Sequence, residues 1–184
     1  GVMTALPMLL VEELDARWAD VQVEQAPVAR LYANQAVLLN VLPFASDDDS
    51  LLARLARDSA QRVGYALSLQ VTGGSSSVRD AWEPMRLAGA TARALLIEAA
   101  ARQWSVPAGQ CRTEAGQVIH DKSGWRVGFG ALVQAAAALT PPAHVPLKDP
   151  ARYQLIGRPL PRQDIPAKVN GSAVRKQKLV DGDA

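Results

Sequence analysis

Two glycines and three serines in a row, in front of a long helical pattern, are the residues of this chain best suited to chemistry. They belong to the stretch QVTGGSSSVRDAWEPMRLAGATARALL, residues 70–96, and follow an expected strand end at 69–71. Backbone N–H groups and hydroxyls at the positive end of a helix would converge on an anion such as phosphate or pyrophosphate. Glycine also permits close backbone approach. The candidate residues are Gly73, Gly74, Ser75, Ser76 and Ser77.

A second interpretation of this loop needs no ligand. Ser77 with Asp80, or Asp80 with Glu83, has the spacing of a capping box, and the glycines would then only form the turn. The Gly-Lys-Ser/Thr ending of a P-loop and the G-x-G-x-x-G spacing are both missing. Both interpretations stay open, and Pro84 leaves open whether the helix begins near Ala81 or is kinked.

Other chemistries have weaker support in the sequence. None of the three serines lies in the G-x-S-x-G context of a hydrolase, so a serine nucleophile is not favoured. A single cysteine, Cys111, excludes an internal disulfide and makes a metal site improbable. The remaining candidates for acid–base work are expected on the surface: Glu12, Glu13 and Asp15 on a solvent-facing side of a helix, and His120 and His144 elsewhere.

The elements that would position the loop indicate an α+β fold with a mixed sheet, several packed helices and an extended proline-rich strap. Scarce aromatic residues (5%) and abundant alanine predict helices that pack closely through small side chains. In the helix expected from residue 51, Leu52, Leu55 and Val63 lie on one face, and the small Ser59 fills the turn between Leu55 and Val63 on that face. We expect helices at 4–17, 51–67, 81–99 and 128–139, strands at 20–26 and possible short strands at 36–39 and 125–127, a hairpin at 111–120, and a strap without helix at 141–166.

Composition limits the classes of function. The net charge is +2, with a basic excess after residue 141 that a solvated linker explains as well as an anionic partner does. The sequence has no apolar run long enough to cross a bilayer and no basic patch with interleaved aromatics for nucleic acid. The first residue is glycine and no targeting signal follows it, so we expect a chain whose start has been cut.

Three separated segments, in this order, carry a specific resemblance. GVMTALPMLLVEELDARWADVQVEQAP begins the chain, QVTGGSSSVRDAWEPMRLAGATAR follows, and VPLKDPARYQLIGRPLPRQDIPAKVNGSA comes last. Together they resemble the molybdenum-cofactor-binding large subunit of the xanthine dehydrogenase and aldehyde oxidase family, in the branch of the isoquinoline 1-oxidoreductase beta subunit. The resemblance covers residues 1–173.

The resemblance implies an oxidoreductase that hydroxylates aldehydes or N-heterocycles with oxygen from water. It implies molybdopterin cytosine dinucleotide as the cofactor, contacted by a loop that corresponds here to Thr72, Gly73, Gly74, Ser75, Ser76 and Ser77. Gly1 corresponds to the last residue of a Met-Gly-Gln-Gly segment. No segment here matches the one that carries the catalytic glutamate, so a fragment inactive by itself is expected.

The resemblance also implies partners and a location. These are the remainder of the molybdenum subunit, a small subunit with two [2Fe-2S] clusters, a cytochrome c as electron acceptor, and the periplasm. We therefore expect a cofactor-contacting domain at 1–140 and an interdomain strap at 141–173. The ending VRKQKLVDGDA, residues 174–184, departs from the family pattern and is a tail of uncertain origin. A non-catalytic interaction or scaffolding domain of the same fold is the alternative.

Overall fold

The computed structural model sets one long helix at the centre of the molecule. It describes residues 1–24, 32–34, 36–39, 41–45, 47–67, 76–163 and 165–172. In chain order the elements are α1 (Val2–Leu14), η1 (Trp18–Asp20), α2 (Ala36–Leu39), α3 (Leu51–Ala66), α4 (Ser76–Trp104), η3 (Ala108–Gln110), β1 (Cys111–Glu114), β2 (Gln117–His120), β3 (Arg126–Gly128), α5 (Phe129–Ala137), η4 (Pro150–Arg152) and α6 (Ile165–Val169). The α+β class is confirmed.

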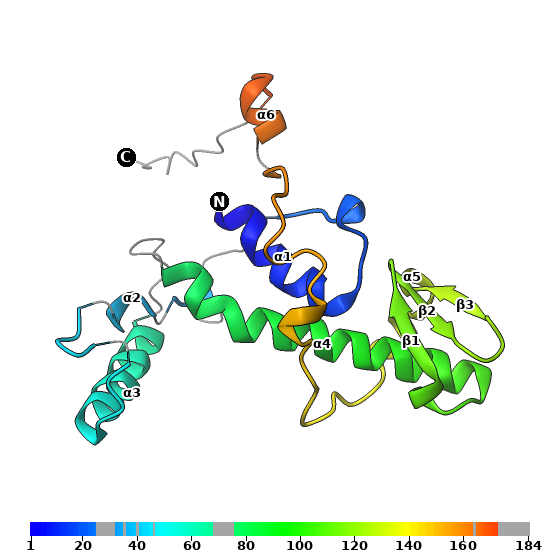
Figure 1. The fold of residues 1–184 in the computed structure, drawn as a ribbon, viewed down its shortest axis with the longest axis horizontal. Coiled ribbons are helices and arrows are strands. Elements are labelled where there is room, and N and C mark those ends of the chain that lie inside the picture. The colour runs from blue at the N-terminus through cyan, green and yellow to red at the C-terminus, as the bar shows by residue number, and fades with distance from the viewer. Residues whose placement is uncertain are drawn as a thin grey trace, which may run out of the picture.

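Helix α4 contacts most of the other elements. Figure 1 shows α1 lying along its middle, the sheet and α5 at its C-terminal end, and α2 with α3 at its N-terminal end. The helix is 29 residues long and continues through Pro84. It begins at Ser76, earlier than the start near Ala81 that the position of Pro84 suggested. Among the described residues, no helix is both long and apolar enough to cross a membrane.

The predicted hairpin is confirmed. Strands β1 and β2 pair antiparallel, with Cys111 opposite His120 and Glu114 opposite Gln117. Ala115 and Gly116 form the turn, both with positive φ, which glycine adopts without strain. Strand β3 adds to β2 in the order β1-β2-β3, so the described strands pair only antiparallel, without the parallel pairing of a mixed sheet.

Small side chains allow α1 and α4 to approach closely. Gly89 lies at their contact, because a Cβ built on it would meet the carbonyl oxygen of Leu10 at 2.3 Å. A second cluster joins α4 to the sheet and α5, as the alanine-rich composition predicted. Its buried members are Leu96, Ala99, Ala100, Val118, Leu132 and Ala136.

Three predicted elements differ from the structure. Residues 21–24 alternate between half-buried and exposed, as a strand would, but they form no strand because no described strand pairs with them. Residues 36–39 form the short helix α2 and not a strand. Pro166 lies in α6, where a missing N–H in the first turn costs little, so the prolines of the strap do not exclude a helix.

Candidate functional site

The first turn of α4 carries the part of the glycine-serine loop that the structure describes. Thr72, Gly73, Gly74 and Ser75 lie outside the described residues, while Ser76 and Ser77 begin the helix. The Ser76 side chain is fully buried, and its Oγ accepts a hydrogen bond from Nδ2 of Asn34 at 2.7 Å. Ser77 is only half-buried. The two serines therefore have different roles, since Ser76 fixes the helix end and Ser77 lies near solvent.

A second contact holds the same end of α4. Oδ1 of Asp80 accepts a hydrogen bond from the backbone N–H of Ala36 at 2.8 Å, which ties α4 to α2. Since α4 already begins at Ser76, Ser77 is inside the helix and does not act as the N-cap of the predicted capping box. The Asp80 carboxylate thus makes a tertiary contact and does not pair with Ser77 in a capping box. The interpretation of this helix end as an anion site therefore remains open.

The N-terminal end of α1 is the second place where backbone N–H groups gather. Gly1 is the N-cap, and its carbonyl oxygen accepts hydrogen bonds from the N–H groups of Thr4 and Ala5, both at 3.0 Å. The Arg162 guanidinium packs against Gly1, 3.2 Å from the position of a Cβ there. Figure 1 shows α1 and α4 running in the same general direction, so both N-terminal ends lie on the same side of the pair.

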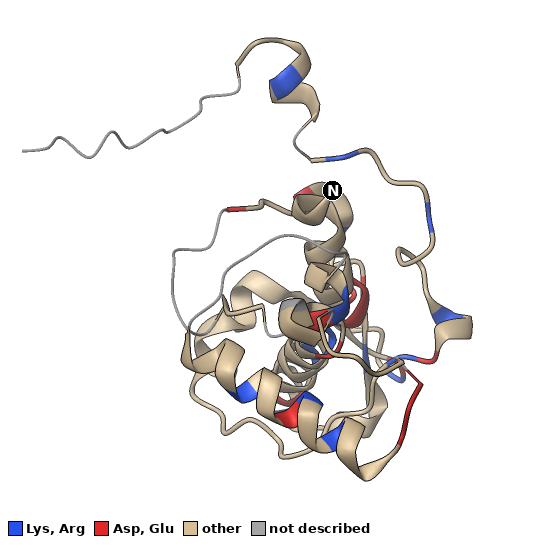
Figure 2. Cartoon of the chain, turned by 90° about the vertical axis from the view of Figure 1, so that its left-hand side faces the viewer, with Lys and Arg blue, Asp and Glu red and all other residues tan. Residues whose placement is uncertain are grey.

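Glu13 is fully buried, although the sequence pattern placed it on a solvent-facing side of the helix. Its Oε1 accepts a hydrogen bond from Nε of Arg86 at 2.9 Å, and Arg93 contributes a second, longer ion pair at 3.5 Å. The backbone N–H of Lys148 also donates to this carboxylate, at 3.0 Å. The guanidinium of Arg86 in turn lies 5.4 Å from the ring centre of Trp82 and 5.3 Å from that of Tyr153. Figure 2 shows acidic and basic residues side by side where α1 passes α4.

Glu12 is also buried and faces the strap that follows α5. Its Oε2 accepts hydrogen bonds from three successive backbone N–H groups, those of Gln154, Leu155 and Ile156, at 2.9, 2.6 and 3.0 Å. Burial by itself raises the pKa of Glu12, but these N–H donors and the nearby Lys148 ammonium outweigh it and hold the pKa below its ordinary value. The carboxylate therefore stays charged at neutral pH.

The strap is held along the whole length of α1. Lys148 pairs with Glu12 and Asp15 near the C-terminal end of the helix. At the other end, the backbone N–H of Gln163 donates to Oγ1 of Thr4 at 3.1 Å. Figure 1 shows the strap, in orange, passing beside α1. These contacts bring residues 162 and 163 to the N-terminal end of α1.

Two residues that could act as a base or a nucleophile, His120 and Cys111, are buried and half-buried respectively. His120 is buried, not on the surface as predicted, and packs against the rings of Trp104 and Trp125. Its Nδ1 lies 2.7 Å from Oγ of Ser123, and its other ring nitrogen is also within hydrogen-bond reach of a side chain. Burial and the charge of a nearby aspartate raise the pKa of Cys111, which keeps it a thiol.

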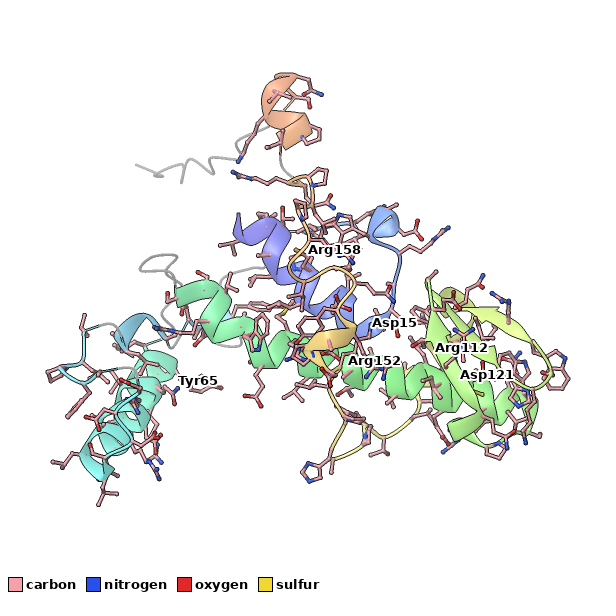
Figure 3. The ribbon with its side chains drawn as sticks, in the orientation of Figure 1. Asp15, Tyr65, Arg112, Asp121, Arg152 and Arg158 are labelled. Atoms are coloured by element: carbon pink, nitrogen blue, oxygen red, sulfur yellow. The ribbon has the colours of Figure 1, made fainter. Side chains whose placement is uncertain are left out.

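A cleft of about 1220 Å³ opens between the C-terminal end of α1, the hairpin and the strap. Figure 3 shows Asp15, Arg112 and Arg152 around it. Arg112 is paired with Glu114 and Asp121, and Asp15 is paired with lysine, so most charges that line the cleft already have partners. The described residues hold no cluster of potential metal ligands.

Sequence reasoning missed most residues that build this region. The roles of Asn34 and Arg86 could not be predicted from the sequence, because the partners that they bond, Ser76 and Glu13, are distant in the chain. The sequence contains only a weak indication that Glu12 and Glu13 are buried. Apolar Leu9 and Val11, which are buried, lie close by on the same helix, so α1 has little surface that is polar throughout.

Three curated proteins are similar to this chain, and no family model matches it. The isoquinoline 1-oxidoreductase subunit beta from Brevundimonas diminuta is 32% identical over 94% of the chain and 23% of its own length. The membrane-bound aldehyde dehydrogenase (pyrroloquinoline-quinone) from Gluconacetobacter polyoxogenes is 38% identical over 67% of the chain and 18% of its own length. One nicotinate dehydrogenase subunit from Pseudomonas putida strain KT2440 is 40% identical over 48% of the chain and 7% of its own length. The chain therefore spans less than a quarter of each relative.

Proposed function

We propose, from the premise that this chain is homologous to the large subunits of the molybdenum hydroxylase family, that it forms part of the cofactor-binding region of such an oxidoreductase. The proposed cofactor is molybdopterin cytosine dinucleotide, and the proposed reaction is the oxidation of aldehydes or N-heterocycles with water as the oxygen source. When bound, the molybdenum centre of the cofactor supplies the hydroxylation chemistry.

The end of α4 is the observation that carries this proposal. Ser76 and Asp80 bind it to the segment before α3 through two side-chain hydrogen bonds, which fix the direction of the helix axis. Ser77 stays accessible in the first turn, where backbone N–H groups have no intrahelical acceptor. Such an end suits a phosphate oxygen, because N–H donors and the helix dipole act together. This supports the proposed contact with the dinucleotide part of the cofactor.

This chain's own residues would bind and orient the cofactor and would not transfer protons. We assign phosphate contacts to Gly1 and to the loop Thr72, Gly73, Gly74, Ser75, Ser76 and Ser77, with Ser76 acting from within as a support for the helix end. Gly1 lies at an N-terminal helix end on the same side as α4, beside a guanidinium. A guanidinium and a helix N-terminus are both positive, so together they favour an anion.

The partners and the location belong to the proposal as well. They are the remainder of the molybdenum subunit, a small [2Fe-2S] subunit, a cytochrome c and the periplasm. The curated relatives support other subunits in general, because two of them are named as subunits.

Calorimetric titration of the chain with pyrophosphate and with cytidine diphosphate tests the proposal. We expect both to bind, and Ser77→Asp to weaken binding by at least about tenfold, because a carboxylate repels phosphate at short range. Ser77→Asn is the matched control, since it has nearly the same shape without the charge. A chain that binds neither anion would contradict the assignment.

The obvious alternative variant, at Ser76, is unsuitable. A bulky acid there would disturb the fold, because Ser76 is fully buried and bonded to Asn34. An aspartate at this position would place an uncompensated charge in the interior, which is destabilising by itself. Loss of binding in Ser76→Asp would therefore not distinguish a binding role from a folding role.

A further inference from the structure

Helix α3 presents its large apolar side chains to solvent. Leu52, Leu55 and Val63 are 71%, 54% and 50% exposed and follow one face of the helix. The helix packs against its neighbours through another face made of small residues, where Ala53 and Gly64 are buried. Figure 1 shows α3 at one end of the molecule, away from α1 and the sheet. Contiguous apolar patches on a surface are typical of interaction sites.

The border of this stripe carries two charges of opposite sign. Asp58 and Arg62 are exposed, one turn apart, on the same flank of the stripe. Neither makes an ion pair with any residue in the described part of the chain. Both charges are therefore available to a partner.

The stripe is complementary to itself when a second copy is placed antiparallel. If Ser59 lies on the two-fold axis, Leu55 of each copy faces Val63 of the other, and the small serine allows close approach. At 1.5 Å per residue, Arg62 of one copy then lies about 3 Å along the axis from Asp58 of the other. The same patch thus supplies matching apolar contacts and two ion pairs, as an isologous interface requires.

We propose that the exposed face of α3 is the interface of a two-fold symmetric dimer of this chain. We favour a second copy as the partner because of the order of the charges of Asp58 and Arg62 and because the small Ser59 lies at the centre of the stripe. About four turns of helix bury less surface than the roughly 1,600 Å² of a stable interface, so the dimer exchanges with monomer in solution.

Sedimentation velocity over a wide range of protein concentration tests the proposal. We expect the dimer fraction to rise with concentration, and Leu55→Glu to reduce the association constant by at least about tenfold, because two carboxylates would enter an apolar contact. Val133→Glu is the matched control, since Val133 on α5 is 51% exposed and lies far from α3. Circular dichroism verifies that both variants are folded.

Charge reversal tests the register. Arg62→Asp should weaken the dimer, and the double variant Asp58→Arg with Arg62→Asp should restore it, because the ion pairs are then re-formed with their signs exchanged. Ser59→Cys, in a chain with Cys111→Ser, should form an intermolecular disulfide, whereas Arg54→Cys on the polar face of α3 should not.

Three results would overturn the proposal. One is a chain that stays monomeric at every concentration, which would leave the face to a different protein. Another is a dimer that Leu55→Glu does not weaken, and the third is a double charge variant that stays as weak as Arg62→Asp.

Discussion

The junction of α1 with the strap and the surface of α3 reverse the usual places of charge and apolar groups. At the junction, Glu12 and Glu13 are 1% and 0% exposed. On α3, Leu52 and Leu55 are more than half exposed. In the first region the acids are placed inside, and in the second the leucines are left outside.

The difference teaches what makes each arrangement tolerable. A buried carboxylate is stable only when donors replace the water that it loses, and Glu12 receives three backbone N–H groups from residues 154–156 of the strap, which lie in no helix or strand. The leucines of α3 have no such requirement, since an exposed apolar group costs little in a single chain. Burial of charge therefore indicates a fixed internal joint, whereas the exposed leucines of α3 form the face for which we propose a partner.

Replacing Glu13 gives the largest expected effect. Glu13→Ala leaves Arg86 and Arg93, whose side chains are 9% and 16% exposed, without their common partner. Breaking a buried pair in this way typically costs about 3–5 kcal/mol of unfolding free energy. Urea denaturation followed by circular dichroism measures it. In the matched control Glu98→Ala, which breaks the exposed pair with Arg102, the loss should stay within about 1 kcal/mol.

Replacing Glu12 gives an effect that depends on pH. Because the pKa of Glu12 is lowered in the folded chain, its contribution is complete above the ordinary value of 4.5 and is lost as pH falls through the lowered folded value. Glu12→Gln should cost about 1.5–3 kcal/mol at pH 7, the value of hydrogen bonds to a charged group. The difference from the unmodified chain should shrink below pH 4.5. Denaturation series at several pH values measure it, and a difference that is equal at all pH values would refute the charged state of Glu12.

Replacing an exposed leucine gives the smallest expected effect. Leu52→Ala should change the unfolding free energy of the monomer by less than about 0.5 kcal/mol, because the side chain is 71% exposed. Leu132→Ala, the same change at a fully buried position, should cost about 2–5 kcal/mol. Thermal unfolding at low protein concentration compares them. A large loss in Leu52→Ala would mean that the stripe of α3 packs inside the chain.

Local sequence signals predicted the elements whose structure depends on near neighbours. The hairpin 111–120 was predicted because alternation and a turn containing Gly116 occur within ten residues. The helix after Gly128 and its end before the paired prolines were predicted in the same way. A helix was expected after the glycine-serine segment as well, with a start near Ala81 or a kink at Pro84 left open, whereas the structure begins it at Ser76.

The candidate site could be predicted only in part, because its supports come from distant residues. Sequence identified Ser76 and Ser77 as part of a helix start but not that Asn34, 42 positions earlier, holds Ser76 in place. It placed His120 on the surface, since the strand pattern does not show that Trp104 of α4 and the nearby Trp125 pack against the ring.

The sequence by itself determined the α+β class, the small-residue character of the helix contacts and the family resemblance, because these depend on composition, period and ordered motifs. Only the tertiary structure decided which face of each helix is buried. A period of 3.6 residues tells which side chains share a face, but whether that face meets protein or water depends on what other segments bring to it. For Glu12 and Glu13 the strap and two arginines of α4 brought donors, and for the stripe of α3 no described segment brought a cover.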